Sequence, residues 1–126
     1  MEIDRLDHLV LTVRNLEESC LFYEKVLGMR REMFGEGRIA LNFGRQKINL
    51  HPDPSPYEPK AKAPTAGSAD LCFVVDRAID TVVAHLKSLE IVIEEGPVAR
   101  SGAVGPITSV YVRDPDGNLI EIATYA

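Results

Sequence analysis

Residues that could do chemistry recur at alternate positions of several short strands that the sequence predicts. From His8 to Val13, the side chains Leu9, Leu11 and Val13 alternate with His8, Val10 and Thr12. In the same way, Glu121 lies between Ile120 and Ile122. Because successive side chains of a strand point to opposite faces, such alternation gives a sheet one apolar and one polar face. The polar face would carry His8, Thr12, Asn49, His51, Asp70, Cys72, Tyr111, Arg113 and Glu121. This density is typical of the wall of a cup that holds a polar ligand or an ion, although an open, solvated face is the alternative.

Imidazole and carboxylate groups on several strands are what a hard or borderline divalent ion requires. Glu121 is costly to bury unpaired between two isoleucines, so a cation or a hydrogen-bonding partner is expected beside it. The other groups have structural alternatives. His8 could be a hydrogen-bonded strand histidine, His51 could belong to a loop because Pro52 follows it, and Asp70 could cap a strand end or pair with an arginine.

Other reactive groups carry weaker signals. Cys72 faces the cup, but nothing adjacent in sequence identifies a base, so a nucleophilic role is not favoured. Tyr111 could bind substrate, and aromatic residues are also simply common in strands. The stretch from Arg100 to Gly105 could form a flexible lid or clamp an anionic substrate, or its glycines could be ordinary loop punctuation.

The elements that position these residues follow one pattern twice. Asn15 is a good N-cap and Gly28 a C-terminal stop for a helix with apolar residues at helical spacing. The first half is predicted as strand 7–13, helix 16–27 and strands 29–34, 38–43 and 47–51. After the proline-rich stretch, the second half is predicted as strand 70–75, helix 78–89 and strands 91–94, 107–113 and 119–124.

The order is therefore βαβββ in both halves. We expect one α+β domain of two tandem modules, residues 1–51 and 69–126, joined by a linker at 52–68 that contains five of the eight prolines. The expected architecture is a curved, cup-like mixed sheet with the helices outside.

Composition narrows the class of protein. The 126 residues have a net charge of −5 and scattered basic residues, which disfavours nucleic acid as a partner. No apolar run is long enough to cross a membrane, and no targeting signal is evident. Two cysteines without metal spacing are typical of reduced thiols, so a cytoplasmic protein is expected. The polar cup described above indicates a small-molecule substrate as its partner.

Three segments resemble the glyoxalase, bleomycin-resistance and ring-cleaving dioxygenase superfamily, also called the vicinal oxygen chelate superfamily. They are the strand from Asp7 to Leu11, the helix that ends in Phe22 to Gly28, and the segment from Arg113 to Glu121. Residues 42–51 and 68–73 look like the glyoxalase-domain proteins sometimes labelled virulence proteins. The resemblance covers the whole chain, and its motifs occur in the family's order and spacing.

The resemblance implies a divalent metal ion, such as Zn²⁺, Ni²⁺, Mn²⁺, Co²⁺ or Fe²⁺. His8 and Glu121 match the first and last ligand positions, and Glu121 would also be catalytic. Asp70 stands where the family usually has a histidine. The fourth position falls on Asn49, with His51 two residues further and facing the same way. Substrate contacts would come from Tyr111, Asn49, Arg113, Thr12 and Cys72.

The function implied is chemistry on a small oxygenated substrate, as a lyase, isomerase or thiol transferase. Two departures, Thr12 in place of an arginine and Asp70 in place of a histidine, argue against a glutathione-dependent glyoxalase. The resemblance to fosfomycin thiol transferases is incomplete, because Val10 replaces a threonine. A metal-free drug-binding protein is the alternative, and a ring-cleaving dioxygenase is less favoured. The family also implies a homodimer whose two sites are shared between chains.

Overall fold

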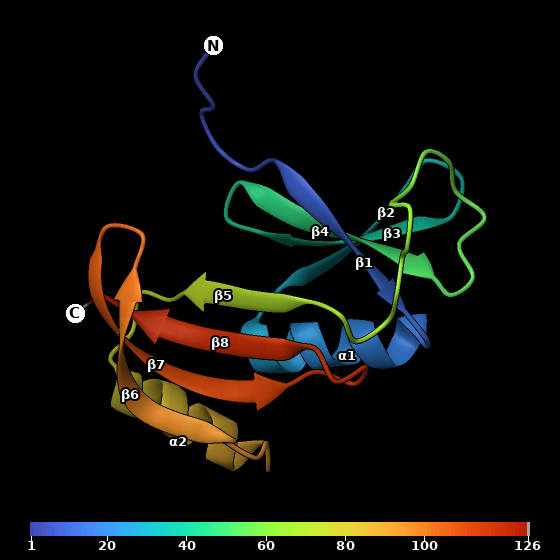
Figure 1. Cartoon of the computed structure of the whole chain (residues 1–126). Coiled ribbons are helices and arrows are strands. Elements are labelled where there is room, and N and C mark those ends of the chain that lie inside the picture. Colours follow the sequence, from blue (N-terminus) through green and yellow to red (C-terminus); the bar gives the residue numbers. More distant parts are fainter. Residues whose placement is uncertain (126) are drawn as a thin grey trace. The chain divides into compact units, whose positions relative to one another are not determined.

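The computed structural model describes residues 1–125 and has the α+β architecture that the sequence predicts. Eight strands and two helices follow the order βαβββ twice (Figure 1). Contacts divide the chain into two compact units, one from Met1 to Gly67 and one from Ser68 onward. Each unit contains one helix and one four-stranded sheet. The proline-rich segment thus belongs to the first unit.

The first unit has a mixed sheet in the strand order β1-β4-β3-β2. Strands β1 and β4 are parallel, as their arrows in Figure 1 show, and the other neighbouring pairs are antiparallel. Its elements are β1 (His8–Val13), α1 (Leu16–Leu27), β2 (Arg30–Phe34), β3 (Arg38–Phe43) and β4 (Gln46–Pro52).

Helix α1 begins and ends where the sequence predicts. The Asn15 side chain accepts a hydrogen bond from the Glu18 N–H at 2.9 Å, which satisfies one donor of the first turn. Gly28 has φ 66°, a left-handed conformation that glycine adopts without strain. The apolar stripe of the helix buries Cys20 and Tyr23 completely.

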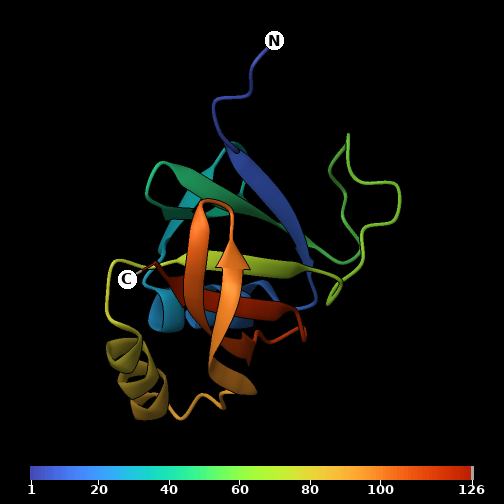
Figure 2. The same ribbon diagram turned by 60° about the vertical axis from the view of Figure 1, so that its left-hand side comes forward.

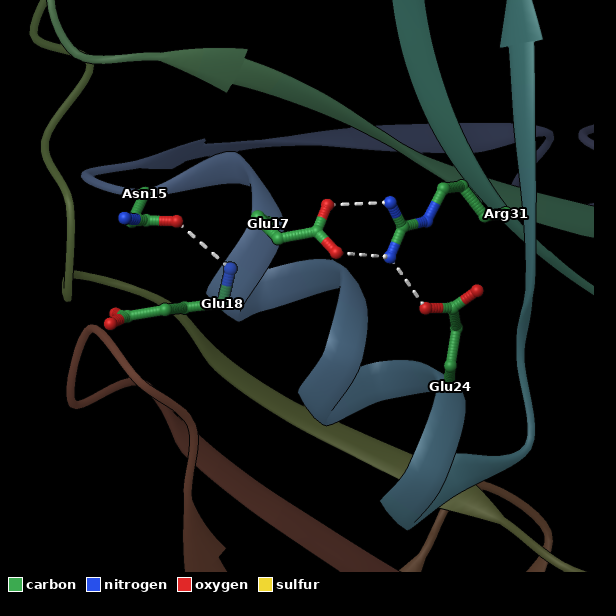
Figure 3. A network of polar contacts seen from close by, with 5 residues as sticks. All are labelled: Asn15, Glu17, Glu18, Glu24 and Arg31. Atoms are coloured by element: carbon green, nitrogen blue, oxygen red, sulfur yellow. Dashed lines mark hydrogen bonds and ion pairs between the residues drawn. The ribbon is translucent and has the colours of Figure 1, made fainter.

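An ion-pair network joins the outer side of α1 to β2 (Figure 3). The Arg31 guanidinium donates to both carboxylate oxygens of Glu17, at 2.7 and 3.3 Å, and to Glu24 at 2.7 Å. Glu17 and Glu24 are seven residues apart, which places them on one side of the helix two turns apart. A single arginine therefore fixes the helix along its strand.

The second unit repeats the arrangement with the strand order β5-β8-β7-β6. Strands β5 and β8 are parallel, and the rest of the sheet is antiparallel. Its elements are β5 (Asp70–Val74), α2 (Ile79–Ser88), β6 (Glu95–Gly102), β7 (Gly105–Arg113) and β8 (Leu119–Thr124).

One expectation for this unit was wrong: the strand predicted at 91–94 lies instead at Glu95–Gly102. The stretch from Arg100 to Gly105, for which a lid, an anion clamp and ordinary loop punctuation were the alternatives, contains the end of β6 and the turn of a β6–β7 hairpin (Figure 2). Gly96 has φ 109°, and a Cβ there would collide with the Ser109 carbonyl, so close packing requires a glycine inside the strand.

The predicted apolar faces form the cores of the two units. Leu11, Val13, Ile48 and Leu50 are buried in the first unit, and Ile120 and Ile122 are buried in the second. Within residues 1–125, neither helix is long and apolar enough to cross a membrane. One face of each sheet packs against the core of its own unit, and the polar residues of the opposite faces are the candidate functional residues.

Candidate functional site

The carboxylate of Glu121 is the centre of the polar face in the second unit. Strand register places Glu121 between Cys72 of β5 and Tyr111 of β7. Its Oε2 accepts a hydrogen bond from the Ser109 hydroxyl at 2.6 Å. Glu121 is half-buried, and no lysine, arginine or histidine within residues 1–125 forms an ion pair with it. Sequence reasoning missed Ser109, although it lies two residues before Tyr111 and so faces the same side.

The Cys72 thiol is held protonated at neutral pH. Although Cys72 is an exposed residue, partial desolvation of its thiol and the negative charge of the neighbouring Glu121 raise the pKa of Cys72 to about 11. Because the thiolate is the nucleophilic form, this environment disfavours Cys72 as a nucleophile and favours it as an uncharged residue that lines the site. The sequence places Cys72 and Glu121 on one face of the sheet, and the strand register makes them direct neighbours.

Tyr111 is oriented by a cation on the neighbouring strand. The Arg100 Nε donates a hydrogen bond to the phenol oxygen at 2.9 Å, and Arg100 also lies 3.3 Å from a carboxylate oxygen of Glu95. Because the phenol oxygen accepts this bond, its own O–H can still donate to another group. Arg100, on strand β6, therefore orients the phenol of Tyr111.

Arg113 is engaged by its own unit. It donates to both carboxylate oxygens of Glu94, at 3.0 and 2.9 Å, and to the Gly117 carbonyl at 3.1 Å. Hydrogen bonding to Arg113 in turn lowers the pKa of Glu94. Asp70, on the first strand of the unit, is exposed. Of the two residues, the structure leaves Asp70 the more accessible to a ligand.

The turn before β8 fixes the positions of Asp70 and Glu121. The Asn118 side chain, 1% exposed, donates to Asp114 at 2.8 Å and accepts from the Ala69 N–H at 2.8 Å. Asp114 in turn accepts the N–H of Asn118 at 2.9 Å. The motif that carried the resemblance is therefore structural: it joins the starts of β5 and β8.

In the first unit, His8 is oriented by its neighbour. Its Nδ1 lies 2.7 Å from the Asp7 carboxylate, and the side chain is 44% exposed. The hydrogen bond with His8 lowers the pKa of Asp7. A carboxylate on one ring nitrogen is the usual support of a metal-ligating histidine, because it directs the other nitrogen, Nε2, outward.

His51 is buried and has both ring nitrogens in contact with other side chains. Nε2 lies 3.2 Å from a guanidinium nitrogen of Arg38, Nδ1 lies 3.1 Å from the Ser55 hydroxyl, and the Tyr57 ring packs edge-on. Burial and the charges of Arg38 and Lys60 lower the pKa of His51. Neither Arg38 nor Ser55 was expected from the sequence, because the segment that carries Ser55 and Tyr57 was read as a linker.

Asn49 has the one buried side-chain oxygen within residues 1–125 that lacks a hydrogen-bond partner. The residue is 6% exposed, and its Oδ1 is the unpaired atom. Leaving a buried acceptor unpaired costs about 1–3 kcal/mol, so a bound donor or ion would be favourable here. Strand register places Thr12 beside His51 and Val10 beside Asn49, as the predicted polar face requires.

Within residues 1–125, no three or more His, Cys, Asp or Glu side chains are grouped so that they could hold a metal ion. The first unit offers the Nε2 of His8 and the amide oxygen of Asn49, and the second offers the carboxylates of Asp70 and Glu121. Imidazole nitrogen and carboxylate oxygen are both donors that divalent ions accept.

Comparisons with known proteins agree with the fold. Residues 5–122 match the family model described as the Glyoxalase/Bleomycin resistance protein/Dioxygenase superfamily. The chain is 55% identical to Virulence protein STM3117 of Salmonella typhimurium, over 99% of this chain and 87% of that protein. It is 51% identical to Glyoxalase domain-containing protein RDO1 of Mycosarcoma maydis, over 99% of this chain and 70% of that protein.

The solved structure of an integron cassette protein, VCH_CASS1, from the mobile metagenome of V. cholerae has the same fold. It superposes with a TM-score of 0.98 at 56% identity, and the match covers 100% of this chain and 98% of that one.

Proposed function

Since the chain belongs to the Glyoxalase/Bleomycin resistance protein/Dioxygenase superfamily, we propose that it is a metal-dependent, glyoxalase-like enzyme acting on a small oxygenated substrate. The observation that carries the proposal is the environment of Glu121. Its half-buried carboxylate receives a hydroxyl donor, Ser109, but no cationic partner within residues 1–125. A partly desolvated carboxylate of this kind is stabilised by a bound cation.

The ligands we propose are His8, Asp70 and Glu121. His8 presents Nε2 because Asp7 holds Nδ1, and Asp70 is exposed at the start of β5. Asn49 could add its unpaired amide oxygen. We exclude His51 from the set, because its Nε2 faces the Arg38 guanidinium and a cation there would be repelled.

A bound divalent ion would act as a Lewis acid that polarises a substrate oxygen and acidifies a neighbouring C–H or O–H. The side chains then divide the remaining work. Glu121 retains lone pairs to accept the released proton, and the Tyr111 O–H, oriented by Arg100, donates a hydrogen bond to a substrate oxygen. Cys72, kept neutral by its raised pKa, adds no negative charge to the site.

Equilibrium binding of Mn²⁺, Co²⁺ and Zn²⁺ to the chelator-treated protein tests the ligand set. We expect about one ion per chain in the wild type and a loss of at least roughly tenfold in affinity in His8→Ala and in Glu121→Gln. His85→Ala, which changes an exposed helix histidine, is the matched control and should bind as the wild type does. Affinities unchanged in both site variants would overturn the proposed ligands.

Activity requires a separate test, with α-ketoaldehydes, epoxides and catechols as substrates for the loaded protein. Turnover that disappears in Glu121→Gln and falls in Tyr111→Phe supports an enzyme. A protein that binds no metal after reconstitution, yet binds one of these compounds stoichiometrically, would instead be a metal-free binding protein.

We also propose a cytoplasmic homodimer. Within residues 1–125, β1 pairs with β4 alone and β5 with β8 alone, so each sheet has an edge strand that could pair further. Val10 and Val74, on these edges, are 45% and 58% exposed. Cys20 and Cys72 are unpaired thiols, which suits a reducing compartment. Sedimentation as a strict monomer at micromolar concentration would contradict the dimer.

A further inference from the structure

The first unit contains a pocket that the ligand set above does not use. Its volume is about 640 Å³, and its wall includes Arg30, Arg45, Lys47, Asp7 and Glu32. The pocket is bounded by the segment that precedes β1, which Gln46 anchors by donating a hydrogen bond to the Leu6 carbonyl at 2.7 Å. It is thus built from β2, from the β3–β4 turn and from the residues just before His8.

Two guanidinium groups in this wall have no partner. Within residues 1–125, neither Arg30 nor Arg45 forms an ion pair or a hydrogen bond through its side chain. Lys47 adds a third positive charge, and its Nζ is held 3.9 Å from the centre of the Phe34 ring. Because the cations of this wall outnumber its two carboxylates, the pocket attracts an anion.

Neither acidic residue of the wall forms an ion pair with Arg30 or Arg45 within residues 1–125. Glu32 accepts from the Asn42 amide at 3.1 Å, and Asp7 is bonded to the His8 ring at 2.7 Å. They therefore leave the arginines available. Because the chain as a whole has a net charge of −5, a basic pocket is not explained by overall composition.

Asp7 connects this pocket to the proposed metal ligand. It lines the cavity and at the same time orients His8, whose strand neighbour is Lys47. We infer that this basic pocket binds the phosphate or carboxylate group of an anionic substrate, whose oxygens would then lie beside His8. The substrate class follows only if the proposed function is correct, whereas the anion site itself does not depend on a metal.

The test is a ¹⁵N–¹H NMR titration of the metal-free full chain, in chelator and at low salt, with inorganic phosphate and separately with acetate. We expect saturable shifts at the backbone amides of residues 30–32 and 44–47. Arg30→Gln and Arg45→Gln should each weaken binding by about tenfold, since each removes a charge-assisted contact. Arg77→Gln, an exposed arginine of the second unit, is the matched control and should change nothing.

The ratio of the two dissociation constants distinguishes phosphate from carboxylate as the group recognised. Equal affinities in the wild type and in the Arg30→Gln/Arg45→Gln double variant, or no saturation by tens of millimolar anion, would overturn the inference. Binding that requires added Zn²⁺ and ignores both arginines would also overturn it, while leaving the metal site intact. Phosphate binding in a protein that holds no metal at His8 and Glu121 would support the anion site and contradict the proposed function.

Discussion

Replacing Asn118 by alanine should destabilise the second unit well beyond an average surface change. The Asn118 side chain is 1% exposed and makes two hydrogen bonds, one to the Asp114 carboxylate and one from the Ala69 N–H, both at 2.8 Å. The alanine variant removes both bonds, so the Ala69 N–H loses its acceptor and the Oδ2 atom of Asp114 loses its amide donor. At about 1–3 kcal/mol for each unsatisfied group, the expected loss is about 3 kcal/mol of unfolding free energy.

Urea unfolding followed by circular dichroism measures this loss. Asn42→Ala is the matched control, because Asn42 makes one exposed hydrogen bond, to Glu32, and its replacement should cost less than about 0.5 kcal/mol. An Asn118→Ala variant as stable as Asn42→Ala would refute the structural role of the turn. The position of Glu121 would then need another explanation.

Three further predictions concern single groups. The rate of Cys72 alkylation should rise about tenfold per pH unit up to the pKa of about 11, and Glu121→Gln should lower that pKa and so speed the reaction at pH 8.5. An unchanged pH profile in Glu121→Gln would show that the carboxylate does not control the pKa of the thiol. Arg31→Gln removes the ion pairs of Figure 3 and should lower the free energy of unfolding in urea by about 1 kcal/mol at low salt, and by less at high salt. A loss of stability that does not depend on salt would indicate that Arg31 acts through packing instead. Gly96→Ala should cost about 3 kcal/mol, because a Cβ there meets the Ser109 carbonyl at φ 109°; a melting temperature equal to that of the wild type would contradict the reading of β6.

The fold could be predicted because the chain's periodicities are regular. Asn15 and Gly28 bound α1 as expected, and the alternation around Glu121 gives the right face of β8. The failure at β6 has a physical cause. The apolar run 91–93 looked like a strand, whereas the true strand begins at Glu95 and includes Gly96, which packing against β7 requires.

The sequence predicts the site only as far as the alternation of side chains along each strand determines which residues share a face of the sheet. Parity places Glu121, Cys72 and Tyr111 on one face, and the strand register shows that Glu121 is the direct neighbour of the other two. It gave no signal for contacts made by side chains far apart in sequence, such as Arg38 on His51. The basic pocket was missed for the same reason, because its arginines come from different strands and turns and converge only in the folded unit.

The central claim is that His8 and Glu121 hold one metal ion. Elemental analysis of protein purified without chelator, beside His8→Ala and Glu121→Gln, tests it most directly. The proposal predicts about one divalent ion per wild-type chain and a strongly reduced content in both variants. A wild type that carries no metal after reconstitution, or variants that retain it in full, would contradict the claim.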